Sequence, residues 1–326
     1  MAEYPACAVQ SAFFYSLTLS IPDENCTMIV QHFQDNTLQN MKRHLLRFAC
    51  RLLFLLAFPA LTHAFPTSSP VPGGIVLLAL KENQVAKSAR YENKKLATLH
   101  ENARDYLLIG LSLASKPGKH TLTIKNTSGQ TEEISFYVKA KAYKSQHLTI
   151  KNKRKVNPYE KDMDRILSEK KRKTRARKTW QANTVQVNFS PPLDGRISSI
   201  FGLRRFFNEQ ARRPHSGLDI AAPQGTPIAA VESGTIIEAG NFFFSGNMVY
   251  LDHGQGIITL YAHMHTIQVK TGDKIKKGQI IGTVGETGRV TGPHLHLAVI
   301  ANQTLVDPLL FLPQLSLKAE EYFKNN

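Results

Sequence analysis

Cysteine is scarce in this 326-residue sequence, and its three cysteines, Cys7, Cys26 and Cys50, all lie in the first fifth of the chain. The later part therefore has neither a disulfide framework nor a cysteine-based zinc site. A metal bound there must use histidine and carboxylate ligands. The sequence also lacks apolar runs of about 20 residues, which excludes a polytopic membrane protein. Its 42% hydrophobic and 20% charged residues exclude collagenous and disordered classes.

Acidic residues are also few, because 25 Asp and Glu face 41 Lys and Arg and leave a formal net charge of +16. This excess favours an anionic partner, but charge alone does not separate nucleic acid from a cell-wall polymer. The segment from Lys139 to Lys178 holds 16 basic and 4 acidic residues, a net charge of +12. Two interpretations stay open: an arm that binds an anionic wall polymer or lipid surface, or a solvated linker kept extended by its own repulsion.

Residues 41–64 have the anatomy of a secretory signal peptide, with a basic head, the apolar run 52–61 and a small residue, Ala64, at the end. The apolar run is about half the length that spans a bilayer. Residues 1–40 contain no Lys or Arg, so we interpret them as a mis-started or non-native leader, with Met41 as the working initiator. Cleavage after Ala64 predicts a protein of the periplasm or cell envelope, with no stable transmembrane span after processing and no nucleic-acid partner.

Residues 65–150 are predicted to form a small β-sandwich domain. Apolar and polar residues alternate through 121–124 and 134–138, and turn-forming residues separate such runs. A basic helical linker is expected over 151–190. Within it Asn157, followed by a proline and then by a glutamate three positions on, indicates the capped start of a helix.

Residues 191–313 are predicted to form a second β domain, followed by a short tail over 314–326. Short apolar runs and glycine-rich turns leave no room for βαβ crossovers, so we expect a mainly β, antiparallel architecture. The clearest expected strands are 198–202, 235–237, 248–251, 257–261 and 294–300.

Two histidine patterns in this domain predict a metal site. His294 and His296 are two residues apart on a strand, so both imidazoles project from one face. His215 and Asp219 form an H-x3-D pair in a glycine-containing segment. Each pattern alone is weak, but together they supply two imidazoles and one carboxylate, which leaves the fourth position of a zinc ion open, as in catalytic sites. His263, in a Tyr-x-His run, adds a further imidazole.

An ordered set of motifs over residues 196–312 resembles the zinc metallopeptidases of the M23, or lysostaphin/LytM, type. The matching segments are 198–205, 214–223, 252–254, 261–263 and 288–296. The resemblance implies a LytM-type, barrel-sandwich-like peptidase domain with one Zn²⁺ per chain and endopeptidase activity on peptidoglycan stem peptides or cross-links. The preceding β domain and basic helix are similar to the Ig-like amino-terminal module of periplasmic members.

The resemblance also implies roles for individual residues. The implied zinc ligands are His215, Asp219 and His296. The two non-ligand catalytic histidines are His263 and His294, and which of them is the general base stays open. The sequence departs from the family pattern at Met264-His265, so a role for His265 in place of His263 is a weaker alternative, while His253 is expected to serve a turn. Arg204, Arg205 and Asn208 are candidates for substrate binding.

Three further alternatives concern the whole protein. A lipoyl or biotinyl carrier matches part of 269–282, but no modifiable lysine stands on a tight hairpin there. A non-enzymatic regulator of other wall hydrolases is the second alternative; the filled ligand positions argue against it. The amino-terminal module could also lie across the catalytic groove and inhibit it, or act as a passive tether, and the sequence does not decide between these.

Overall fold

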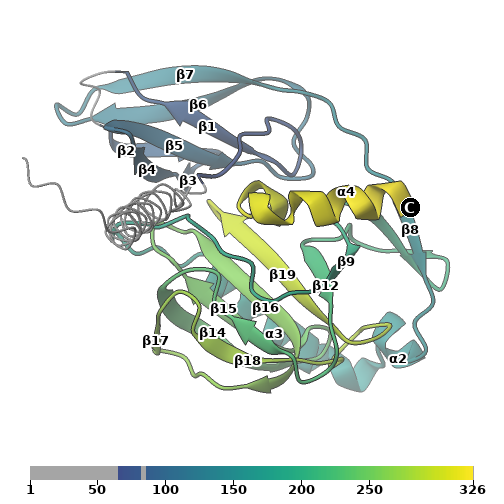
Figure 1. The fold of residues 1–326 in the computed structure, drawn as a ribbon. Helices are drawn as coiled ribbons and strands as arrows, with labels where there is room; N and C mark the ends of the chain where they lie inside the picture. The colour runs from purple at the N-terminus through teal and green to yellow at the C-terminus, as the bar shows by residue number, and fades with distance from the viewer. Residues whose placement is uncertain (1–64, 82–85, 326) are drawn as a thin grey trace, which may run out of the picture. The chain divides into compact units, whose positions relative to one another are not determined.

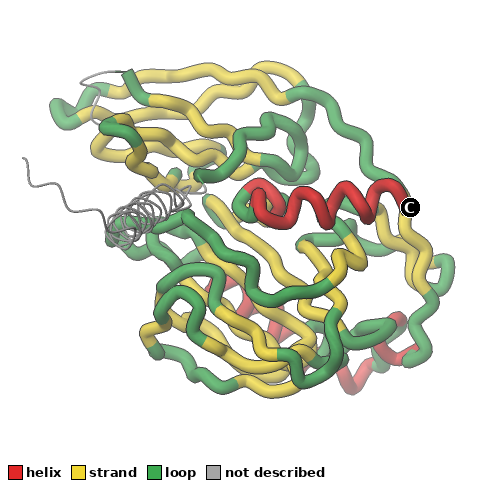
Figure 2. Tube along the Cα trace, viewed as in Figure 1, coloured by secondary structure: helices red, strands yellow, loops and turns green. Residues whose placement is uncertain are grey.

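The computed structural model describes residues 65–81 and 86–325 (Figure 1). The predicted leader and signal peptide, residues 1–64, lie outside the described residues. Within the described part, every helix is too short or too polar to cross a membrane. Strands dominate the trace and helices are few (Figure 2). The predicted mainly β, antiparallel class is therefore confirmed.

The amino-terminal part consists of two antiparallel sheets that share a core. One sheet has the order β1 (Ile75–Ala79), β5 (Arg104–Gly110), β4 (Ala97–Glu101). The other has the order β3 (Lys94–Lys95), β2 (Ala86–Tyr91), β6 (Gly118–Asn126), β7 (Thr131–Val138). In β6 the buried Leu122 and Ile124 alternate with exposed threonines, because successive side chains of a strand point to opposite faces. This alternation gives the sheet its apolar inner face. The Ig-like topology of this part stays a prediction.

The segment between the two β-rich parts, called the linker from here on, folds as a strand followed by short helices: β8 (Ser145–Leu148), α2 (Lys153–Val156), the 3₁₀ turn η1 (Glu160–Asp162) and α3 (Met163–Arg177). It therefore includes β8, which precedes the range 151–190 expected from the sequence. The prediction that Asn157 caps the long helix is wrong, because Asn157 ends α2. Asp162 is the N-cap residue of α3, and Tyr159 is that of the η1 turn that leads into it; the Tyr159 backbone N–H donates to the Asp162 carboxylate at 3.1 Å. Arg154 holds that carboxylate with two hydrogen bonds, which places the acid where the first turn needs an acceptor.

Ten antiparallel strands form the sheet of the carboxy-terminal part. The main path has the order β17, β14, β15, β16, β19, β12, β9, with β13 and β20 at its margins and β18 pairing both β13 and β16. Their bounds are β9 Arg196–Ser199, β12 Leu218–Ala221, β13 Pro227–Ala229, β14 Gly234–Phe242, β15 Gly246–Asp252, β16 Ile258–Ile267, β17 Lys274–Ile275, β18 Ile280–Val284, β19 His294–Ala301 and β20 Thr304–Val306. The strands expected from the sequence all lie within or overlap these elements. β19 is buried along almost its whole length, so its side chains on both faces are enclosed.

A small third sheet joins the linker to the second β domain. Its order is β11 (Gln210–Ala211), β10 (Arg204–Phe207), β8, and β8 pairs with β10 in parallel. The chain ends with η2 (Pro308–Leu310), η3 (Pro313–Leu315) and α4 (Ser316–Asn325). The predicted tail over 314–326 therefore includes a helix.

Some basic residues of α3 are paired with acids, one on β14 and one in the helix itself. Arg172 forms a two-pronged ion pair with Glu238 of β14, at 2.7 and 3.1 Å. Arg165 donates to Glu169 at 2.7 Å, and Glu169 also accepts from the Phe243 backbone N–H at 2.8 Å. These contacts fix the helix against β14 and the turn that follows it.

Candidate metal centre

Two strands and the turn before one of them bring the predicted ligands together. Asp219 on β12 lies opposite His296 on β19, and Ala262 on β16 lies opposite the same histidine from the other side. His215 reaches the centre from the turn before β12. Gly217 in that turn passes so close to β19 that a Cβ there would lie 2.3 Å from the Leu297 carbonyl oxygen and 2.7 Å from the His296 ring. Only glycine permits this approach, which explains the residue between the two ligand candidates.

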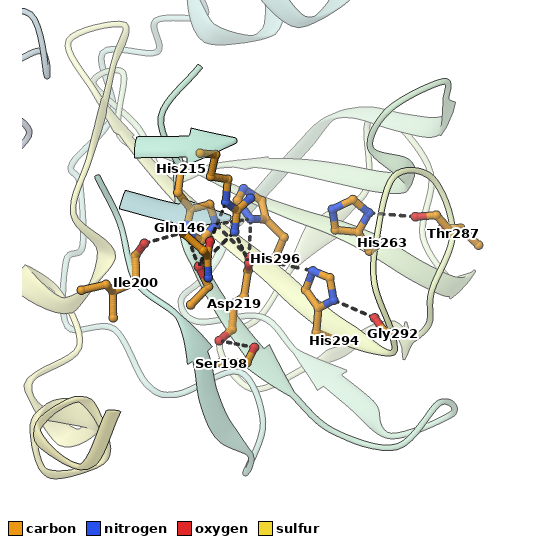
Figure 3. Close-up of polar contacts among 12 residues, drawn as sticks. Gln146, Ser198, Ile200, His215, Asp219, His263, Thr287, Gly292, His294 and His296 are labelled. Atoms are coloured by element: carbon orange, nitrogen blue, oxygen red, sulfur yellow. Dashed lines mark hydrogen bonds and ion pairs between the residues drawn. The ribbon is translucent and has the colours of Figure 1, made fainter. Parts of the chain in front are cut away.

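The three side chains converge on one point (Figure 3). His215 Nε2 lies 2.9 Å from Asp219 Oδ1, and His296 Nδ1 lies 2.7 Å from the same oxygen. The two nitrogens are 3.1 Å apart. All three side chains are buried. The structure thus brings together His215, Asp219 and His296, the residues that the sequence singled out as ligands.

The hydrogen bonding of His215 tests whether a cation fits among these atoms. Its Nδ1 lies 2.6 Å from the Ile200 carbonyl oxygen. Because a carbonyl only accepts, Nδ1 carries the hydrogen and Nε2 presents its lone pair to the other two residues. Lone-pair donors that face each other repel unless a cation lies between them. Tetrahedral zinc with bonds of about 2.0–2.1 Å separates its ligands by about 3.3 Å, so the set fits zinc after small outward shifts.

Burial sets the protonation states that a metal ligand needs. It lowers the pKa of His215 to about 4, so the imidazole is neutral at neutral pH. Burial also disfavours the charge on Asp219, but His215, Arg205 and the hydrogen bonds around the carboxylate together hold its pKa well below the usual range. The centre therefore combines neutral imidazole with ionised carboxylate, the forms that bind metal.

A second layer of polar side chains holds the Asp219 carboxylate. Arg205 Nη2 donates to Asp219 Oδ2 at 2.7 Å and to Ser199 Oγ at 3.0 Å. Gln146 Oε1 accepts from Arg205 Nε and from Ser199 Oγ, each at 3.1 Å. The oxygen that faces Arg205 is not the one that faces the histidines. The carboxylate is therefore fixed in orientation, which is what second-layer contacts do in metal sites.

Sequence reasoning missed Gln146 and Ser199, and it proposed a different role for three neighbours. Arg205 is engaged with the carboxylate rather than free for substrate. The Asn208 amide pairs with the backbone of Ile150, at 2.8 and 3.2 Å, and so secures the linker. Arg204 is exposed. No local pattern marks Gln146, because only the parallel pairing of β8 with β10 brings it to the centre.

Two further imidazoles lie beside the ligand cluster (Figure 3). His263 Nδ1 lies 2.8 Å from the Thr287 carbonyl oxygen, and His294 Nδ1 lies 2.8 Å from the Gly292 carbonyl oxygen. Both rings therefore carry hydrogen on Nδ1 and present Nε2 as an acceptor. Their ring centroids are 4.9 Å apart. Burial, reinforced by the neighbouring histidines, places the pKa of His263 well below its usual value.

A β-bulge separates His263 from His265. The pairing of β16 with β15 shifts register between Tyr261 and Met264, and His263 has a φ of +63°. A bulge re-aims a side chain, so the simple alternation that would place both histidines on one face fails. His265 is exposed, and its backbone carbonyl accepts from Asn247. The structure brings His263 to the centre and leaves His265 outside it.

His253 lies apart from the centre, in a buried polar contact. Its Nδ1 lies 2.8 Å from the Ser233 carbonyl oxygen and its Nε2 lies 2.8 Å from Thr259 Oγ1. Both ring nitrogens are engaged, and burial lowers its pKa to about 4. This agrees with the structural role expected from its position in a turn.

The centre opens onto a groove of about 560 Å³. His215, His263 and His296 lie in its wall, together with aromatic side chains and a set of cations. The amino-terminal part contributes Lys94 and Leu113, and α3 contributes two basic residues. Such a volume lies within the range of small-molecule and peptide sites. Substrate that enters this groove would meet the acceptor nitrogen of His263.

A mainly β domain that holds two histidines and a carboxylate beside two further imidazoles, at the wall of a groove, defines a metal-dependent hydrolase. Residues 213–308 match peptidase family M23, and residues 68–141 match the M23 N-terminal domain. A crystal structure from Pseudomonas aeruginosa assigned to peptidase M23 is 34% identical, with a TM-score of 0.64, and the match covers 75% of this chain and 95% of that one. The chain belongs to peptidase family M23 and thereby to the metallopeptidases. The predicted resemblance is confirmed.

Curated relatives share only part of their length with this chain. Peptidoglycan DD-endopeptidase ShyC of Vibrio cholerae is 44% identical over 141 residues, which are 41% of this chain and 33% of ShyC. DD-carboxypeptidase/endopeptidase Mpg of Neisseria meningitidis is 43% identical over 122 residues, 37% of this chain and 28% of Mpg. The matched part therefore spans a third or less of these relatives.

Proposed function

We propose that the protein is a zinc-dependent endopeptidase that hydrolyses peptide bonds in peptidoglycan stem peptides or cross-links, in the periplasm or cell envelope. The observation that carries this proposal is the convergence of His215, Asp219 and His296 at the wall of a groove, beside two imidazoles whose acceptor nitrogens are unengaged by backbone. The names of the peptidoglycan endopeptidases among the relatives support the substrate class.

Zinc held by the three ligands would activate water and polarise the scissile carbonyl. The chain itself supplies proton transfer. His263 and His294 are oriented by their Nδ1–H donation to backbone carbonyls, so each can accept a proton at Nε2 and return it to the leaving amine, or hold the developing oxyanion once protonated. Which of them begins as the base stays open. The second-layer contacts of Arg205 keep the carboxylate ligand in place during these steps.

A non-enzymatic regulator that binds peptidoglycan is the alternative proposal. A regulator needs the groove but has no need of a complete set of ligand and auxiliary histidines. Here all five side chains are present and meet in one place, which favours catalysis. The basic linker as a binder of anionic wall polymer or lipid stays a prediction, and Arg165 and Arg172 already have partners within the protein.

Metal content and turnover together test the proposal. Purified protein should contain about one equivalent of zinc and release peptide fragments from purified sacculi, and a chelator should stop the release. His296→Ala should lose both zinc and activity. His294→Ala should keep zinc and lose turnover, and His265→Ala, an exposed histidine on the same strand as His263, is the matched control that should keep both. Full turnover in His294→Ala would show that the division of roles is wrong. Zinc-loaded protein that binds sacculi without releasing fragments would support the regulator.

A further inference from the structure

Arg289 stands in the wall of the catalytic groove as a guanidinium held between two aromatic rings. Its guanidinium carbon lies 4.6 Å from the ring centroid of Phe207 and 4.6 Å from that of Phe244. To the residues that the structure describes, its side chain makes one hydrogen bond, a long one of 3.5 Å from Nη1 to the Lys155 carbonyl oxygen. Among the residues that the structure describes, no carboxylate lies within ion-pair distance of this guanidinium.

Two other partly buried arginines, by contrast, do have carboxylate partners. Arg205 pairs with Asp219, and Arg172 pairs with Glu238. At Arg289, burial lowers the pKa to about 10, and the charge of Arg205 acts in the same direction. A cation placed there without an anion is therefore unfavourable in free energy. The arrangement is explained if an anion from outside the chain completes it.

The rest of the groove wall is also positively charged. Among the described residues that line it, six are basic and none is acidic. The pKa of Lys173 is lowered by burial and by the positive charges of Arg177, Arg289 and Arg213. The repulsion among these cations shows that the groove concentrates positive potential beside His263 and His296, where it attracts an anionic ligand.

The stacking also fixes the direction of binding. With two aromatic rings 4.6 Å from its central carbon, the guanidinium keeps its in-plane N–H groups for hydrogen bonding, and these match the two oxygens of a carboxylate. The phenylalanine rings also exclude water, which strengthens such a contact. We propose that Arg289 binds a free carboxylate of the substrate, so that the groove selects peptides that carry a carboxylate close to the scissile bond. This proposal rests on the proposed endopeptidase function and specifies its substrate class.

Two synthetic cross-linked stem peptides provide the kinetic test, one with a free carboxylate next to the scissile bond and one with a carboxamide there. A charge-assisted hydrogen bond of about 1.5–3 kcal/mol predicts that zinc-loaded protein prefers the carboxylate about 10- to 150-fold in kcat/KM. Arg289→Gln should abolish the preference, mainly by raising KM for the carboxylate peptide. Arg196→Gln, which removes an exposed arginine outside the groove, is the matched control and should keep the preference. Equal cleavage of both peptides by unaltered protein would overturn the proposal.

Calorimetric titration separates this proposal from the proposed function. Metal-free protein should bind the carboxylate peptide more tightly than the carboxamide, and Arg289→Gln should remove the difference. If the zinc-loaded protein cleaves neither peptide, the endopeptidase proposal fails, while the titration still decides whether Arg289 binds carboxylate. If Arg289→Gln weakens the binding of both peptides to the same extent, its role is purely structural and the proposal is overturned. Binding of inorganic phosphate as tightly as the carboxylate peptide would also overturn it.

A lysine variant guards against a folding defect. If thermal unfolding shows that Arg289→Gln is not folded, Arg289→Lys retains the positive charge but lacks the planar fork. Its preference for the carboxylate peptide over the carboxamide peptide should be smaller than that of the unaltered protein but should not vanish. A preference as large as that of the unaltered protein would contradict the role of the fork.

Discussion

The contact between Asn302 and Gly110 offers a quantitative test of how the two β-rich parts are joined. Asn302, in the turn between β19 and β20, is 3% exposed. Its Oδ1 accepts from the Gly110 backbone N–H at 2.5 Å, and its Nδ2 donates to the Gly110 carbonyl oxygen at 3.1 Å. Gly110 ends β5 in the segment that matches the M23 N-terminal domain, and Asn302 lies in the segment that matches the peptidase family. The Asn302 side chain thus satisfies both the backbone N–H and the backbone carbonyl of Gly110.

Asn302→Gly removes these hydrogen bonds without straining the turn. Asn302 has a φ of +39°, which glycine adopts freely. A buried donor or acceptor left without a partner costs about 1–3 kcal/mol, so loss of both contacts should lower the free energy of unfolding by about 2–6 kcal/mol. At roughly 2–4 °C per kcal/mol, the value for a folded unit of 150 to 250 residues, that corresponds to a fall in Tm of roughly 4–24 °C.

Gln303→Gly is the matched control, because it lies in the same turn, has a φ of +64° and is exposed. It makes the same change in the flexibility of the unfolded chain but removes no buried hydrogen bond. Urea unfolding at 25 °C should therefore show Asn302→Gly to be the less stable variant by the stated amount. Equal midpoints and equal slopes for the two variants would refute the reasoning.

Three smaller perturbations test other parts of the structure. Gln146→Ala should weaken zinc binding about 10-fold in a chelator competition, because it releases the second-layer contacts of the carboxylate ligand, whereas the exposed Gln268→Ala should not. Tyr261→Phe should lower the free energy of unfolding by about 1–3 kcal/mol in urea, since the buried Tyr261 hydroxyl accepts from the Val231 N–H at 2.9 Å; an unchanged midpoint would contradict this. Burial raises the pKa of Asp307, so its ionisation disfavours the fold as pH rises above about 4, the ordinary value. The Tm of Asp307→Asn should therefore rise relative to that of the unaltered protein as the pH increases from 4 to 7. A Tm difference that does not change with pH would exclude this cause.

Sequence periodicity predicted the strands well because most of them obey simple alternation. His294 and His296 share a face on β19 for this reason, and their two-residue spacing was sufficient to predict it. The meeting of Asp219 with His296 was predicted only from motif chemistry, since it depends on the register of two strands far apart in the sequence. Alternation failed at His263, where one extra residue in β16 re-aims the side chain.

The start of the long helix shows a second kind of limit. Asn157 has the right neighbours for a cap, yet it ends the short helix α2 instead. The acceptor that the first turn needs comes from Asp162, whose carboxylate is positioned by Arg154 from the preceding helix. A local pattern therefore predicted that a helix begins in this region but not which residue caps it. The deciding contact lies between two elements rather than within one.

The metal-ligand candidates and the groups that orient them lie in different parts of the chain. All three ligand candidates lie in the segment that matches the peptidase family, residues 213–308. The groups that orient the carboxylate, Gln146, Ser199 and Arg205, all precede it, and Gln146 also lies beyond the match to the M23 N-terminal domain, residues 68–141. Because β8 pairs directly with β10, Gln146 lies among the groups that hold the Asp219 carboxylate. We therefore expect a substitution in β8 to alter the affinity of the proposed metal site without changing a ligand candidate, because it alters the orientation of Asp219.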